Sequence, residues 1–229
     1  MKYNNIVEAT FLERPNRFIA YARLGEEIVI CHVKNTGRCR ELLIPEKTKV
    51  YLEDHGENTE RKTRYSLIKV VKGDRIINMD SQAPNQIVKE WMEQGGLYPD
   101  IRYIKRECKY DNSRFDIYYE RENGIKGFVE VKGVTLEDND VARFPDAPTE
   151  RGVKHIYELI QAKGEGYEAN IVFVIQMDGI RYFTPNDAMH KAFGDALREA
   201  KKAGVNIVAV ECDVTKDEVW AKDYVTVHL

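Results

Sequence analysis

The chain has 229 residues, of which 43% are hydrophobic and 32% charged, and its formal net charge is -3. This length suits one large domain or two small ones, and the near balance of charges excludes a uniformly basic nucleic-acid coat protein. The N-terminus lacks the apolar stretch of a signal peptide, and apolar runs such as Ile171–Ile175 are too short to span a bilayer. We therefore expect a cytoplasmic protein without membrane segments.

The first third of the chain is predicted to be all β. Short runs rich in β-branched and aromatic residues, separated by turns such as Asn35–Arg38, recur at 18–23, 27–33, 49–52, 65–71 and 75–78. Regular short strands with little helix are typical of a small barrel. We expect an OB-type barrel over residues 1–80.

The four cysteines give no sign of a metal site or a disulfide framework. None is in a CxxC pair or near histidine at zinc-finger spacing, so reduced structural thiols are expected at Cys31, Cys39, Cys108 and Cys212.

The pattern changes near Ala83-Pro84, and residues 81–229 are predicted to form a second domain, an α/β sandwich. Ile87, Val88, Trp91 and Met92 follow helical spacing before Gly95-Gly96. The further expected elements are strands at 102–110, 114–120 and 125–132, a helix at 149–163, strands at 170–176 and 180–184, a helix at 186–203 and a strand at 205–211.

Asp116, Glu130 and Lys132 are the main candidates for chemistry. Thirteen residues separate the two carboxylates, which lie on two strands expected to form a hairpin. Side chains alternate along a strand, so Glu130 and Lys132 share a face and Val131 points to the opposite layer. Hard cations such as Mg²⁺ prefer carboxylate oxygens, and a nearby lysine can balance charge on a phosphate. This pattern is typical of a metal-dependent phosphodiesterase, although a structural network of ion pairs would also fit it.

The helix expected at 149–163 has Thr149 as a plausible N-cap. Its buried face is predicted to carry Val153, Ile156, Tyr157 and Ile160. Its opposite face would then carry Arg151, Lys154, His155 and Glu158. This face is either simply solvated or a phosphate-binding surface beside the carboxylates.

Weaker candidates lie outside these segments. Glu90 falls outside the apolar stripe of the first helix of the second domain and alone reads as a surface residue. In the barrel, basic residues including Arg38 alternate with aromatic residues, which suits single-strand binding as well as an ordinary core with a charged surface.

Four segments, in this order, resemble the sugar fermentation stimulation protein A family across essentially the whole chain: Asn35-Thr36-Gly37, Ser113-Arg114-Phe115-Asp116, Glu130–Leu136 and Phe144–His155. The resemblance implies an OB-type domain followed by a restriction-endonuclease-like domain of the PD-(D/E)xK type. It also implies that Asp116, Glu130 and Lys132 match the catalytic motif, with Phe115 in place of the motif's proline. The superfamily often adds a helical glutamate, for which Glu90 is the best-placed residue, and a basic or polar residue on the following helix, for which Lys154 or His155 fits.

The resemblance implies a nuclease that cleaves DNA or RNA with Mg²⁺ or Mn²⁺ bound by Asp116 and Glu130, with Glu90 as a possible third ligand. The residues expected to contact nucleic acid are Arg38, Arg114, Arg151, Lys154 and His155. The alternative is a non-catalytic DNA-binding regulator of sugar metabolism on the same scaffold. The sequence predicts neither the oligomeric state nor a preference between DNA and RNA.

Overall fold

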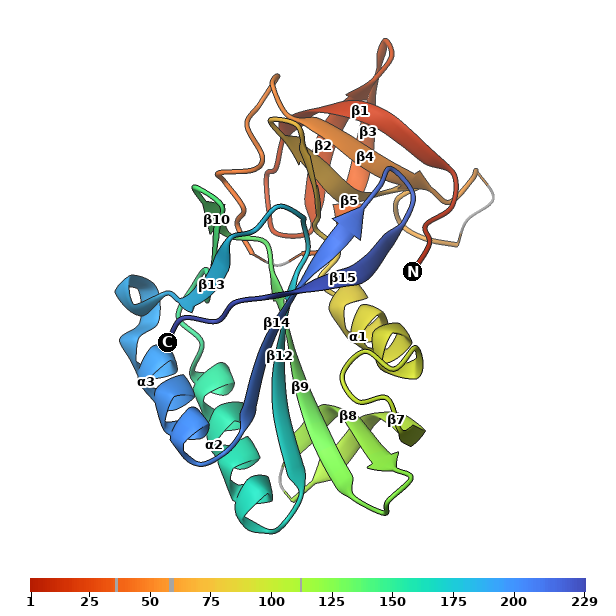
Figure 1. Cartoon of the computed structure of the whole chain (residues 1–229). Helices are drawn as coiled ribbons and strands as arrows, with labels where there is room; N and C mark the ends of the chain where they lie inside the picture. Colours follow the sequence, from red (N-terminus) through yellow and green to blue (C-terminus); the bar gives the residue numbers. More distant parts are fainter. Residues whose placement is uncertain (36, 58–59, 112) are drawn as a thin grey trace.

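The computed structural model describes residues 1–35, 37–57, 60–111 and 113–229. Thr36, part of the Asn35-Thr36-Gly37 segment and of the expected turn there, lies outside the described residues. The N-terminal unit is a barrel and the C-terminal unit is a sheet with helices on both faces (Figure 1).

The barrel consists of β1 (Ile6–Glu13), β2 (Ile19–Leu24), β3 (Glu27–Val33), β4 (Lys49–Asp54) and β5 (Tyr65–Lys72), with β6 (Arg75–Asn78) as an added edge. The strand order is β3-β2-β1-β4-β5-β6, and a parallel pairing of β3 with β5 closes the barrel. The predicted OB-type fold is confirmed. No bounds were predicted for a strand before Phe18. The apolar pattern of β1 is weak, since only Ala9 and Phe11 of this strand are buried.

The second unit has a six-stranded sheet of order β15-β14-β12-β9-β8-β7. Its helix α1 (Ala83–Glu93) covers one face, whereas α2 (Glu150–Gly164) and α3 (Asp187–Lys202) cover the other (Figure 1). The strands are β7 (Ile101–Tyr110), β8 (Ser113–Arg121), β9 (Lys126–Val134), β12 (Glu168–Ile175), β14 (Asn206–Val214) and β15 (Val219–Val225).

Two details differ from the predicted α/β sandwich. The strand expected at 180–184 is β13 (Tyr182–Pro185), which leaves the main sheet and pairs with β11 (Val141–Phe144), itself paired with β10 (Glu137–Asp138). The edge strand β15 was not predicted, since most of its side chains are exposed and only its two end valines, Val219 and Val225, are buried. The four cysteines are unbridged, as expected.

Thr149 is the N-cap of helix α2, as predicted, and its Oγ1 accepts a hydrogen bond from Gly152 N at 3.1 Å. A Cβ at position 152 would lie 2.9 Å from Thr149 Cγ2 and 3.1 Å from Phe193 Cε2. Glycine therefore allows Phe193 of α3 to approach the first turn of α2.

The two units are joined by buried polar contacts. Lys69 of β5 is completely buried, and its Nζ donates to the carbonyl oxygens of Thr215 at 2.8 Å, Lys216 at 3.3 Å and Glu218 at 2.9 Å. Asn78 Nδ2 donates to Gln176 Oε1 at 2.7 Å. Residue 81, the predicted domain boundary, lies between β6 and α1. Among the helices described, none has the length and apolar character required to cross a bilayer.

Candidate metal and phosphate site

The site is built where β8 and β9 separate. Their antiparallel pairing extends to Ile117 opposite Val129, and Asp116 lies just beyond that pair. Asp116 Oδ2 accepts a hydrogen bond from Val131 N at 2.8 Å, and Oδ1 accepts one from Asn85 Nδ2 at 2.9 Å. The strand end and the first turn of α1 therefore fix both oxygens of this carboxylate.

The charged form of Asp116 is electrostatically unfavourable at this position. Its burial, followed by the nearby negative charge of Glu130, raises the pKa of Asp116 above its ordinary value. The two hydrogen bonds and Lys132 only partly oppose this rise. Burial and like charge together make the pair a place where a cation would be stabilising.

Glu130 is held by one oxygen and free at the other. It is only 2% exposed, and Oε1 accepts from Lys132 Nζ at 2.6 Å and from His155 Nδ1. Oε2 is buried and has no hydrogen-bond partner among the residues that the structure describes. Burial alone would raise the pKa of Glu130, but His155 and Lys132 outweigh it and hold that pKa below the ordinary range.

The sequence placed His155 on the wrong face of α2. His155 is 7% exposed and lies on the buried face with Ile156 and Leu159, whereas Tyr157, predicted to be buried, is 46% exposed. The helix packs against both the sheet and α3, where Gly152 meets Phe193, and this packing decides which of its faces is buried. His155 consequently reaches Glu130 and also borders the neighbouring cavity.

His155 acts as a link between Glu130 and Arg151. Arg151 Nε donates to His155 Nε2 at 3.3 Å, and His155 Nδ1 donates to Glu130 Oε1. This arrangement orients Glu130 with its second oxygen unoccupied by protein donors.

A broad cavity of about 830 Å³ opens beside this link. It brings together four of the predicted phosphate-binding residues, of which Arg114, Arg151 and Lys154 are exposed and His155 is buried. The complete lining is Glu107, Lys109, Asp111, Ser113, Arg114, Arg151, Lys154 and His155. Arg114 pairs loosely with Glu107 at 3.3 Å and Lys154 with Glu158 at 3.5 Å, and a phosphate can compete for these two solvent-accessible cations.

Two predicted residues do not join this site. The Glu90 carboxylate lies on α1 but accepts from the Met1 ammonium at 2.7 Å and from Gln86 Nε2 at 2.8 Å, so the structure does not bring it to Asp116. Arg38 lies in the barrel, on the segment that connects β3 to β4.

The donor set fits a hard divalent cation at the two carboxylates. Within the described ranges no group of three His, Cys, Asp or Glu side chains is close enough to hold a metal ion. The oxygen donors that the site offers a cation are therefore two carboxylates, Asp116 and the free Oε2 of Glu130. Mg²⁺ commonly binds through one or two carboxylates and keeps water or phosphate oxygens at its other positions.

Sequence reasoning missed Asn85 and the pair formed by Ser113 and Glu158. Ser113 Oγ donates to Glu158 Oε1, and Glu158 Oε2 is buried without a partner among the described residues. Asn85 and Asp116 are 31 residues apart. No sequence periodicity connects these positions, because the contacts depend on how α1 and α2 are placed on the sheet.

Asp116→Asn is expected to stabilise the metal-free protein at pH 7 by about 1 kcal/mol, because it removes a buried charge facing Glu130. The folded pKa of Asp116 is raised, so its charged form costs stability above that pKa, and the advantage of Asn shrinks as pH falls through it. Denaturant unfolding with a chelator at pH 7 and at acid pH measures the difference.

Asp195→Asn is the control of opposite sign, because hydrogen bonding from Lys191 lowers the pKa of Asp195. That variant should lose stability at pH 7. A destabilised Asp116→Asn protein at pH 7 would contradict the electrostatic account of the pair.

Comparison with known proteins matches the whole chain. Family models described as "SfsA N-terminal OB domain" and "Sugar fermentation stimulation protein RE domain" match residues 12–79 and 82–218. Proteins named "Sugar fermentation stimulation protein homolog" include one from Clostridium beijerinckii, 57% identical over 100% of both chains. Another, from Desulfitobacterium hafniense, is 58% identical over 100% of this chain and 99% of that protein.

A solved structure described as "The structure of Pyrococcus Furiosus SfsA in complex with Ca2+" is 29% identical, with a TM-score of 0.89. The alignment covers 100% of this chain and 98% of that chain. These matches and the observed layers confirm the predicted OB-type barrel followed by a restriction-endonuclease-like α/β domain.

Proposed function

The chain belongs to the sugar fermentation stimulation protein family, and from that premise we propose that it is a metal-dependent nuclease that hydrolyses phosphodiester bonds of DNA or RNA. One observation carries the proposal. Glu130 Oε2 is buried and unpartnered among the described residues, next to a second carboxylate whose pKa is raised by burial and by Glu130. Lys132 and His155 compensate the charge of Glu130 through Oε1, so the charge of Asp116 and the free Oε2 are what a cation would stabilise.

A divalent cation is the partner that best suits this pair. Mg²⁺ or Mn²⁺ held by Asp116 and Glu130 would activate a water molecule and neutralise charge on the phosphate. The related Pyrococcus furiosus protein was solved with Ca²⁺, which supports divalent-cation binding by this scaffold without identifying the residues here. Glu90 is not part of this proposal, because its carboxylate is paired with the chain's own ammonium.

The remaining residues have distinct tasks. Lys132 donates to Glu130 with one of its three N–H groups, which leaves two that can orient the attacking water or a phosphate oxygen. Arg151, Lys154 and Arg114 line the adjacent cavity and would hold the flanking phosphates. His155 orients Glu130 and also lines the edge of this cavity.

The test is incubation of the wild type and Asp116→Asn with labelled single- and double-stranded DNA and RNA, with Mg²⁺, with Mn²⁺ and with a chelator. We expect cleavage of at least one substrate that requires the metal and is lost in Asp116→Asn, because that change removes one of two ligands. Denaturant unfolding of the same variant distinguishes loss of activity from loss of fold.

Tight nucleic-acid binding by the wild type without cleavage under any of these conditions would reject the nuclease. It would favour a non-catalytic DNA-binding protein, and footprinting of one defined site would then identify a regulator.

A further inference from the structure

A cleft lies between the two units, and its lining comes from both of them. Its volume is about 720 Å³, within the range of about 300–1,000 Å³ typical of small-ligand sites. The barrel contributes the segment that follows β3, and the second unit contributes the end of β9 and the segment that joins β11 to α2. Asp116, Glu130 and Lys132 are not among the described residues that line it, so this cleft is distinct from the carboxylate site.

Three of the four segments that resemble the sugar fermentation stimulation protein family meet in this cleft. They contribute Asn35 and Gly37, Gly133–Leu136 and Phe144–Thr149 to its lining. These are the parts of the three segments that the carboxylate site does not use. Segments far apart in the sequence therefore converge on one cavity that has no part in the chemistry at Glu130.

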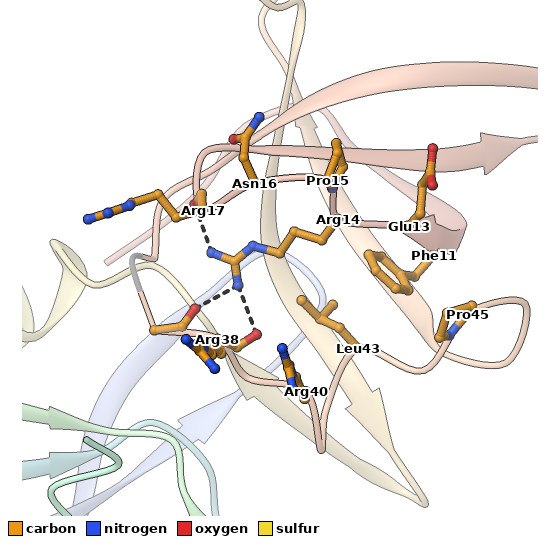
Figure 2. A pocket seen from close by; sticks show the side chains of 11 residues that line it. Phe11, Glu13, Arg14, Pro15, Asn16, Arg17, Arg38, Arg40, Leu43 and Pro45 are labelled. Atoms are coloured by element: carbon orange, nitrogen blue, oxygen red, sulfur yellow. Dashed lines mark hydrogen bonds between the residues drawn. The ribbon is translucent and has the colours of Figure 1, made fainter.

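The barrel wall of the cleft is fixed before any ligand arrives. The guanidinium of Arg14 donates to the carbonyl oxygens of Gly37 at 2.7 Å and Arg38 at 3.1 Å (Figure 2). The second amino group of this guanidinium donates to the carbonyl oxygen of Arg17 at 2.7 Å, on the connection between β1 and β2. The backbone that carries Arg38 is thus held in place, and binding needs little ordering of this segment.

The wall formed by the second unit contains an unpartnered donor. Gln176 is only 1% exposed, and its Oε1 accepts from Asn78 Nδ2 at 2.7 Å, whereas its Nε2 has no acceptor among the described residues. A Cβ on the neighbouring Gly133 would lie 3.3 Å from this nitrogen and 2.7 Å from Pro84 Cγ, so glycine keeps the amide uncovered. A buried N–H without an acceptor costs free energy, and this one is available to a ligand in the cleft.

The charged donors of the lining also lack partners. Arg38 and Arg40 are exposed and Arg143 is half-buried, and their side chains form no ion pair or hydrogen bond with any residue that the structure describes. Arg143 lies on β11, so each unit supplies at least one free guanidinium. The acidic residues of the lining, Glu41 and Asp146, are both exposed, where water and salt screen their charge.

From this lining we propose that the cleft binds a small organic oxyanion, whose charged group lies between Arg38 of the barrel and Arg143 of the second unit. Guanidinium groups bind phosphate and carboxylate alike through paired N–H donors. One oxygen of the ligand accepts from Gln176 Nε2, and its carbon body packs on Pro148 and Met189, two exposed residues of the lining. Such a ligand joins the two units, because each supplies one of its arginines.

Calorimetry of the full-length protein with a chelator measures this binding without metal and without cleavage. The probes are phenyl phosphate and benzoate, each compared with its ring-free counterpart, inorganic phosphate and acetate. We expect one of the two ring probes to bind at one site per chain with a Kd of about 1 mM or below. Its counterpart should bind at least about five times more weakly, because it leaves Pro148 and Met189 uncovered. The tighter of the two ring probes identifies the head group as phosphate or carboxylate.

Arg143→Gln and Arg38→Gln should each weaken the tighter probe at least about tenfold, because each removes a charged donor from one side of the cleft. Neither side chain has another partner among the described residues, so both variants should melt with the wild type when no probe is present. A saturating probe should raise the melting temperature of the wild type and leave that of Arg143→Gln unchanged.

Arg181→Gln is the matched control, since Arg181 is an exposed arginine of the second unit that does not line the cleft. It should bind the probe as the wild type does. Arg151→Gln should also do so, because Arg151 belongs to the cavity beside Glu130.

Absence of saturable binding, an equal loss in either of these two controls, or a loss in only one of Arg143→Gln and Arg38→Gln would each overturn the proposal. Displacement of the probe by a short single-stranded oligonucleotide at micromolar concentration would assign the cleft to nucleic acid and overturn it as well. None of these results requires catalysis, so a wild type that cleaves nothing leaves this test intact.

Discussion

Lys132→Ala is expected to lower metal-dependent phosphodiester cleavage by about 10²–10³-fold, the usual cost of losing one positioned donor to a transition state. Lys132 Nζ lies 2.6 Å from Glu130 Oε1. Among the described residues, this buried carboxylate has two side-chain donors, Lys132 and His155. Without the lysine, the attacking water loses its orienting N–H groups and Glu130 keeps only His155.

The fold and the metal should both survive this change. Lys132 contributes no apolar core contact, and Asp116 and Glu130 retain their oxygens. Calorimetry with Mn²⁺ should therefore show binding in Lys132→Ala and none in Asp116→Asn. The thermal midpoint should fall, because the buried Glu130 loses one of its two donors, while the protein stays folded at the assay temperature.

Lys126→Ala is the matched control, since Lys126 is an exposed lysine on the same strand β9, at its opposite end. It should cleave at the wild-type rate within about twofold. Unchanged magnesium-dependent cleavage in Lys132→Ala would contradict the role assigned to this lysine. The role of the two carboxylates would still be testable.

Lys69→Met is expected to lower the free energy of unfolding by about 3 kcal/mol or more, because it leaves three carbonyl oxygens without their shared donor. Those carbonyls belong to residues 215–218 of the second unit, and Lys69 is completely buried in the first. Burial lowers the pKa of Lys69 to about 8, so the ammonium is still mostly protonated at pH 7. Methionine fills the volume without donating.

For a chain of this length, a loss of about 3 kcal/mol corresponds to a fall in melting temperature of about 6–12 °C. Lys72→Met is the control, since Lys72 also joins the two units through Glu137 but is 39% exposed. Its loss should cost less than about 1 kcal/mol. Equal denaturant midpoints for the two variants would show that the buried ammonium does not stabilise the joint.

The barrel and the sandwich were predictable because their strands are short apolar runs, alternating in β8 and continuous in the buried strand β12, and both patterns are local. The alternation of side chains along a strand placed Glu130 and Lys132 on one face, and the structure shows them in contact, with Val131 in the layer beneath α1. To place Asp116 near them, it was enough to predict that the two strands form a hairpin, the shortest connection between strands.

Helix α2 shows where the pattern failed. Its residues Val153, Tyr157 and Ile160 are as apolar as Ile156 and Leu159, so the sequence allowed several rotations about the helix axis. Packing between the sheet and α3 selected the rotation that buries His155 against Glu130. The rotation of a helix about its axis is decided by both surfaces that it packs against, and the sequence allowed only one of these surfaces to be foreseen.

By itself, the sequence determined the two fold classes, the strand positions of Asp116, Glu130 and Lys132, and the N-cap of α2, because these depend on contacts a few residues apart. Only the tertiary structure decided that Glu90 pairs with the Met1 ammonium, that Asn85 and His155 orient the carboxylates, and that the barrel arginines face the cleft. Those relations join distant segments through close packing, which no local pattern of residues specifies.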